Sequence, residues 1–138
     1  MPEKLKVLVV DDEADIRDVI RLTLEEEGYE VFEAACGQEA VDQAKKVKPN
    51  LIVLDFTLPD FNGDRVCELL KEDEENRKIP VLLLTGRDEA AEVQKAMECG
   101  ANAYQAKPFE PKQLVALLGT LVNTSKFSKK WEKSQWQE

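Results

Sequence analysis

Short apolar runs alternate along the chain with longer segments in which apolar residues recur every three or four positions. The most apolar runs cover residues 7–10, 51–54 and 80–84. A run of this kind, with no polar residue in it, is typical of a strand that is buried on both faces in a parallel sheet. Two weaker runs, at residues 30–34 and 103–106, predict two further strands.

The segments between the strands have the apolar spacing of amphipathic helices. Ile16, Ile20 and Leu24 mark the first of them, and Gly28 is expected to end it. Further helices are expected around residues 40–47, 66–70, 93–97 and 111–122. Strand and helix thus alternate five times, which predicts an α/β fold with a doubly wound parallel sheet and helices on both faces.

The composition excludes several functions. The length of 138 residues predicts one domain of ordinary size. The formal net charge of −9 argues against direct nucleic-acid binding by this chain. No apolar run approaches the roughly 20 residues of a membrane span, and the amino terminus lacks a signal-peptide pattern. A cytoplasmic protein without a membrane partner is therefore expected.

The histidine and cysteine content limits the kinds of catalytic and metal-binding site that are possible. The sequence contains no histidine, which excludes histidine acid–base catalysis, histidine metal ligands and a phosphohistidine on this chain. Cys36, Cys67 and Cys99 match no zinc or redox spacing, and are expected to be small buried residues in a reducing compartment. Any metal would therefore be a hard cation on oxygen ligands.

Polar side chains that suit phosphoryl chemistry follow four of the predicted strands. They are Asp11 and Asp12 after the first strand, Asp55 after the third, Thr85 after the fourth and Lys107 after the fifth. Each alone is explained by a turn or a helix cap, but the carboxyl ends of parallel strands share the edge where α/β sheets bind ligands. Together, the acids can hold a Mg²⁺-like ion, one carboxylate can be the nucleophile, and the lysine can neutralise a phosphoryl group.

The chain resembles the receiver domain of bacterial two-component response regulators over about residues 5–123. The matching positions are Asp11-Asp12, Asp55, Leu58-Pro59-x-x-Asn62-Gly63, Thr85-Gly86 and Tyr104-x-x-Lys107-Pro108-Phe109. The resemblance implies a flavodoxin-like sheet of five parallel strands in the order 2-1-3-4-5. It also implies a phosphoacceptor whose donor is a histidine kinase or a histidine phosphotransfer protein. Such a domain is no turnover enzyme and carries out only Mg²⁺-dependent self-phosphorylation and autodephosphorylation.

The resemblance assigns a role to each acid of the motif. Asp55 would be the phosphoacceptor. Asp12, Asp55 and the backbone carbonyl of Thr57 would bind Mg²⁺ (or Mn²⁺) directly, and Asp11 would bind it through a water.

The resemblance also implies a switch. Lys107 would contact the phosphoryl oxygens, and its bond to Pro108 would be cis. Thr85 would swing towards the phosphoryl group, and Tyr104 would move into the vacated space. This would repack the face made by the fourth helix, the fifth strand and the fifth helix, where a partner or a second copy of the chain is expected to dock.

Three other classes of protein fit the sequence less well. A phosphohydrolase of the haloacid-dehalogenase type needs a second Asp two residues after its nucleophile, where this chain has Thr57. A pseudo-receiver, which is never phosphorylated, usually lacks some of the acids or the lysine. A flavodoxin-like cofactor protein would place a flavin phosphate against the acidic loop that follows the first strand, which would repel it.

The apolar pattern stops near Asn123. Residues 1–123 are expected to form the receiver domain, and residues 124–138 a tail or linker. The tail contains both tryptophans of the chain, Trp131 and Trp136, which could anchor a partner or pack back on the fifth helix. A disordered end, or the cut edge of a longer protein, is the favoured interpretation.

Overall fold

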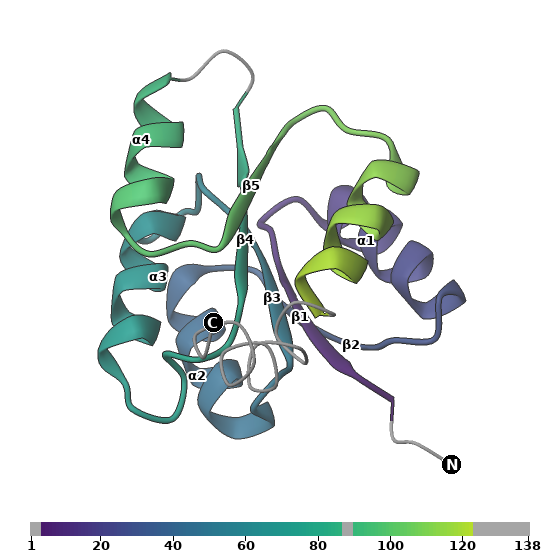
Figure 1. Cartoon of the computed structure of the whole chain (residues 1–138), viewed down its shortest axis with the longest axis horizontal. Coiled ribbons are helices and arrows are strands. Elements are labelled where there is room, and N and C mark those ends of the chain that lie inside the picture. Colours follow the sequence, from purple (N-terminus) through teal and green to yellow (C-terminus); the bar gives the residue numbers. More distant parts are fainter. Residues whose placement is uncertain (1–3, 87–89, 123–138) are drawn as a thin grey trace, which may run out of the picture.

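Five short strands form a parallel sheet in the computed structural model, which describes residues 4–86 and 90–122 (Figure 1). The strands are β1 (Lys6–Val10), β2 (Glu30–Ala34), β3 (Leu51–Asp55), β4 (Val81–Thr85) and β5 (Ala103–Ala106). Their order across the sheet is β2-β1-β3-β4-β5, and every neighbouring pair is parallel. The predicted α/β fold is therefore confirmed, together with the strand order that the resemblance implied.

Helices cover both faces of this sheet. They are α1 (Ala14–Glu26), α2 (Gly37–Val47), α3 (Gly63–Glu72) and α4 (Ala90–Glu98), and a further helix spans residues 111–122. Figure 1 shows α2, α3 and α4 on one side of the sheet, and α1 with helix 111–122 on the other. Helices α1 to α4 extend beyond the apolar positions that predicted them, because their ends include residues outside the apolar pattern, whereas helix 111–122 has the expected bounds.

Each face of the sheet has its own apolar core. Successive side chains of a strand point to opposite faces. In β3, Ile52 and Leu54 pack on the side of α2, α3 and α4, whereas Leu51 and Val53 pack on the side of α1 and helix 111–122. All residues of β3 and β4 are buried, which explains why their sequences show no alternation of polar and apolar residues.

A glycine ends the first helix, and a proline precedes the fourth strand. Gly28 follows α1 with φ +93°, and the Tyr29 amide donates to the Leu24 carbonyl at 3.1 Å, so the glycine ends the helix as expected. The fourth strand begins at Val81, one residue later than predicted, because Pro80 has no amide hydrogen for the strand ladder. The Pro80 carbonyl still accepts the Ile52 amide at 3.0 Å.

The cysteines only partly follow the prediction. Cys67 and Cys99 are buried, but Cys36 is only partly buried. The expected tail, with Trp131 and Trp136, lies outside the described residues.

Candidate functional site

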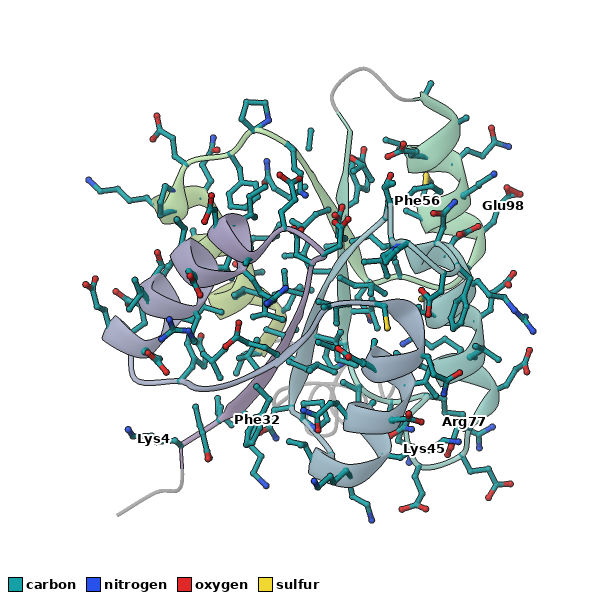
Figure 2. All side chains as sticks on the ribbon, turned by 180° about the vertical axis from the view of Figure 1, so that it is seen from behind. Lys4, Phe32, Lys45, Phe56, Arg77 and Glu98 are labelled. Carbon is teal, nitrogen blue, oxygen red and sulfur yellow. The ribbon has the colours of Figure 1, made fainter. Side chains whose placement is uncertain are left out.

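Three acids lie together at the edge where β1 and β3 end. Carboxylate oxygens of Asp11, Asp12 and Asp55 all lie within 4.8 Å of one another. Asp11 is completely buried and Asp55 is 6% exposed, whereas Asp12 is open to solvent. In Figure 2, Phe56 marks this edge of the sheet directly after Asp55, and the labelled side chains of Lys45 and Arg77 lie towards the opposite edge.

Lys107 brings a positive charge to the acids from the end of β5. Its Nζ lies 2.9 Å from Asp11 Oδ2 and 3.1 Å from Asp55 Oδ2. Its backbone amide donates to the Thr85 carbonyl at 2.8 Å, which fixes the start of the loop, and the following bond to Pro108 is cis as the resemblance implied. One ammonium faces three carboxylates, so the ionised cluster keeps two negative charges.

This surplus of negative charge changes the titration of the groups. Burial of Asp55, and then repulsion by Asp11, raise the pKa of Asp55 to about 6, although Lys107 and the Thr57 amide hydrogen-bond to its carboxylate and oppose the rise. Burial would lower the pKa of Lys107, but its hydrogen bonds and attraction to Asp11 and Asp55 outweigh this and raise it. Asp55 is therefore mostly ionised at neutral pH, although burial and Asp11 destabilise its charged form. A further cation would stabilise that form.

Thr85 contributes a hydroxyl that is buried without a partner. The residue ends β4 and is completely buried. Within the part of the chain that the structure describes, its Oγ1 forms no hydrogen bond. Most buried hydroxyls are hydrogen-bonded, so this group is available to an incoming acceptor.

Tyr104 lies apart from the acids, on the surface of β5. Its side chain is 46% exposed, and Met97 of α4 is 69% exposed. Both border a depression of about 340 Å³ between α4 and β5, which Ala101 and Asn102 also line.

Sequence reasoning missed three residues that support the site. Arg17 donates to the Asp11 carbonyl at 2.7 Å and pairs with Glu33 at 2.9 Å. Glu92 of α4 accepts the Gly86 amide at 2.8 Å, directly after Thr85. The third residue is Asp60, whose carboxylate accepts three backbone amides. All three bind backbone groups, which no side-chain motif records, so the sequence offered no signal for these roles.

The described part of the chain contains no helix long and apolar enough to cross a membrane.

The model of the response regulator receiver domain matches residues 7–119. The chain belongs to this family. Receiver domains are phosphoacceptor modules of two-component signalling and interact with histidine kinases.

Relatives and solved structures agree with this assignment. The alkaline phosphatase synthesis transcriptional regulatory protein PhoP of Bacillus subtilis is 38% identical over 123 residues, which are 89% of this chain and 50% of that protein. The phosphate regulon transcriptional regulatory protein PhoB of Pseudomonas aeruginosa is 43% identical over 116 residues, 84% of this chain and 51% of that protein. The chain therefore spans about half the length of the curated relatives it matches.

Among solved structures, the chemotaxis protein CheY4 of Vibrio cholerae is 32% identical, with a TM-score of 0.81 over 86% of this chain and 98% of that one. A CheY-like receiver domain protein of Methanospirillum hungatei is 27% identical, with a TM-score of 0.86 over 91% of this chain and 99% of that one. In both cases the match covers nearly the whole length of the solved chain.

Proposed function

We propose that this receiver domain accepts a phosphoryl group on Asp55, with Mg²⁺ (or Mn²⁺) bound beside it. The observation that carries the proposal is the cluster of Asp11, Asp12 and Asp55, with carboxylate oxygens within 4.8 Å of one another. Lys107, 3.1 Å from Asp55, supplies a cation on the same edge.

The cluster fits a hard divalent cation. Its donors are oxygens, which Mg²⁺ prefers, and a divalent charge balances the two negative charges that Lys107 leaves uncompensated. Asp12, Asp55 and the backbone carbonyl of Thr57 are the proposed direct ligands, and Asp11 is proposed to act through a water. When bound, the ion neutralises negative charge on the transferring phosphoryl group.

The residues of the chain have distinct roles in the transfer. A carboxylate oxygen of ionised Asp55 attacks the phosphorus, so that an O–P bond forms while the bond from phosphorus to the donor's histidine nitrogen breaks. The released nitrogen keeps the electron pair and takes up a proton. Lys107 contacts the phosphoryl oxygens, and the unpartnered hydroxyl of Thr85 donates a hydrogen bond to one of them.

The proposed donor is a histidine kinase or a histidine phosphotransfer protein, in the cytoplasm. The chain has no second acid at Thr57, where a turnover phosphohydrolase would need its general acid, so its own chemistry is limited to self-phosphorylation and autodephosphorylation.

The proposed output is a change in the face formed by α4, β5 and helix 111–122. Movement of Thr85 towards the phosphoryl group lets Tyr104, now 46% exposed, turn inwards. The depression beside Met97 then changes shape. An output partner or a second copy of the chain would read this change. Residues 1–123 form the receiver domain in this proposal, and residues 124–138 a tail or linker.

Intact mass spectrometry tests the acceptor. The protein is incubated with Mg²⁺ and acetyl phosphate, as wild type, as Asp55→Asn and as Asp42→Asn, which removes an exposed acid of α2. We expect a single phosphoryl adduct on the wild type and Asp42→Asn, and none on Asp55→Asn. An adduct that persists on Asp55→Asn would place the acceptor elsewhere. No adduct on any variant, with no binding of beryllofluoride, would identify a receiver fold that is never phosphorylated.

A further inference from the structure

The amino end of α2 receives its cap from a distant segment. Cys36, at the N-cap position, makes no side-chain capping bond. Instead, the Gly37 amide donates to Asp60 Oδ1 at 2.7 Å and the Gln38 amide donates to Asp60 Oδ2 at 2.8 Å. The Phe61 amide adds a third bond to Oδ1 at 2.8 Å. One carboxylate thus joins α2 to the loop between β3 and α3, residues 56–62, across more than 20 positions of sequence.

The same loop also packs directly on the helix. A Cβ atom on Gly37 would lie 2.6 Å from Phe61 Cε2 and 3.0 Å from Asp60 Oδ1. A larger residue at this position would therefore displace the Phe61 ring, so the first turn of α2 is in close contact with the loop.

The bonds to Asp60 persist over a wide range of pH. Burial disfavours the charged carboxylate, but the amides of Gln38, Gly37 and Phe61 outweigh it and lower the pKa of Asp60 to about 2. The amide-rich amino end of a helix is also where a negative charge is favoured. Asp60 is therefore ionised at neutral pH, and its carboxylate can accept hydrogen bonds from these amides.

The loop that Asp60 restrains begins at the acid cluster. Thr57 follows Asp55 by two residues, and its backbone amide acts to lower the pKa of the Asp55 carboxyl. The two ends of the loop are tied together by the Gly63 amide, which donates to the Phe56 carbonyl at 2.6 Å. Asp60 ties the middle of the loop to α2, so the backbone at Thr57 is held between two fixed points.

We propose that Asp60 is a positioning residue that sets the metal-binding geometry of the receiver by fixing residues 56–62 on the amino end of α2. The inference rests on the proposed function, because Thr57 is the proposed backbone ligand. Asp60 itself is not a member of the acid cluster. Its removal takes away no ligand and leaves the charge of the cluster intact. Partners that orient metal ligands from outside the coordination shell typically change metal affinity by about 10- to 100-fold.

The test compares two caps at the same end of α2. Asp60→Ala removes the cap that comes from the loop. Glu39→Ala is the matched control, because Glu39 Oε1 accepts the Ala35 amide at 2.8 Å at the same helix end without binding the loop. Asp60→Asn, which keeps an acceptor oxygen for Gly37 and Phe61, serves as the conservative variant and as the fallback if Asp60→Ala does not fold. Mg²⁺ affinity is measured by calorimetry on the full chain, and amide hydrogen exchange is measured without metal.

We expect Asp60→Ala to weaken Mg²⁺ binding about tenfold, Asp60→Asn to weaken it less, and Glu39→Ala to leave it unchanged, although both alanine variants lower the melting temperature. Faster exchange at residues 57–61 should appear in Asp60→Ala only. Equal Mg²⁺ affinities in wild type and Asp60→Ala, or equal losses in Asp60→Ala and Glu39→Ala, would overturn the inference. If the wild type binds no Mg²⁺, the proposed metal site fails. In that case hydrogen exchange alone tests whether Asp60 fixes residues 56–62 on α2. Unchanged exchange in Asp60→Ala would show that it does not.

Discussion

At the scale of single residues, Asp55 combines two properties that oppose each other. It is nearly buried, which disfavours its charge, and yet its proposed role as nucleophile requires it to be ionised. The cluster resolves this with a pKa of about 6: high enough to show that the free carboxylate is destabilised, and low enough that it is ionised at neutral pH. A cation bound beside the cluster would stabilise the ionised form of Asp55 and so lower its pKa.

The first prediction concerns Asp55→Asn without metal. The folded protein holds the Asp55 proton more tightly than the unfolded chain, where the pKa is ordinary. This carboxyl therefore stabilises the fold below about pH 4 and loses that contribution as the pH rises through about 6. We expect Asn to raise the free energy of unfolding by about 1 to 2 kcal/mol at pH 7, after allowance for solvent screening, and by almost nothing at pH 4. Urea unfolding at both pH values measures this, and a difference independent of pH would contradict it.

The second prediction concerns Thr85→Val. The substitution replaces the unpartnered buried hydroxyl by a methyl group of similar size, so the desolvation cost of the hydroxyl disappears. We expect the free energy of unfolding to rise by about 1 kcal/mol, while beryllofluoride binding with Mg²⁺ weakens. Thr120→Val is the control, because the Thr120 hydroxyl is exposed and donates to the Ala116 carbonyl. A loss of stability in Thr85→Val would mean that the hydroxyl has a partner.

The sequence could predict part of the site. Asp11, Asp55 and Lys107 could be grouped in advance because each follows a strand, and the ends of parallel strands meet at one edge. Their proximity is now observed, whereas their chemical roles stay predictions. Asp60 could not be found in this way, because its partners are backbone amides, which every residue except proline carries.

At the scale of elements, the turn from β3 into α3 is tightly constrained. A Cβ atom on Gly63, the first residue of α3, would collide with the Asp55 carbonyl and lie 2.8 Å from Leu83 Cδ2. The helix must therefore start against the backbone of the strand that carries the proposed phosphoacceptor. By contrast, a Cβ atom added to Gly119, within helix 111–122, would have no atom within 4 Å.

The third prediction contrasts these two glycines. Gly63→Ala forces backbone apart and should lower the free energy of unfolding by about 3 kcal/mol. Gly119→Ala removes a flexible residue from a helix interior and should raise it by about 0.5 to 1 kcal/mol. Denaturant unfolding of both variants at one pH makes the comparison. A Gly63→Ala protein as stable as the wild type would show that the turn can relax.

The positions of helices and strands were easier to predict from the sequence than their exact ends. Apolar spacing located α2 from Ala40, yet the helix begins at Gly37. The difference arises because the cap comes from Asp60, a residue of another segment, and local sequence does not contain it. Similarly, the absence of an amide hydrogen on Pro80 set the start of β4 one residue later than its apolar run.

At the scale of the whole molecule, both apolar cores of the described residues are built from positions between Leu5 and Val122. The fourth prediction tests the proposed domain boundary: a chain that ends at Asn123 should keep the urea midpoint and the Mg²⁺-dependent phosphorylation of the 138-residue chain. Parallel unfolding curves and intact masses of the two proteins provide the measurement. A lower midpoint in the shorter chain would assign a stabilising role to residues 124–138.

The bond between Lys107 and Asp11 spans 96 positions of sequence, and this separation has a consequence for a protein made from its amino terminus. The acids at the ends of β1 and β3 leave the ribosome long before the lysine that follows β5. A growing or prematurely ended chain therefore carries the proposed acceptor, Asp55, without the lysine that lies 3.1 Å from it in the full structure. Under the proposed function, phosphorylation with the help of this lysine requires that synthesis has passed residue 107.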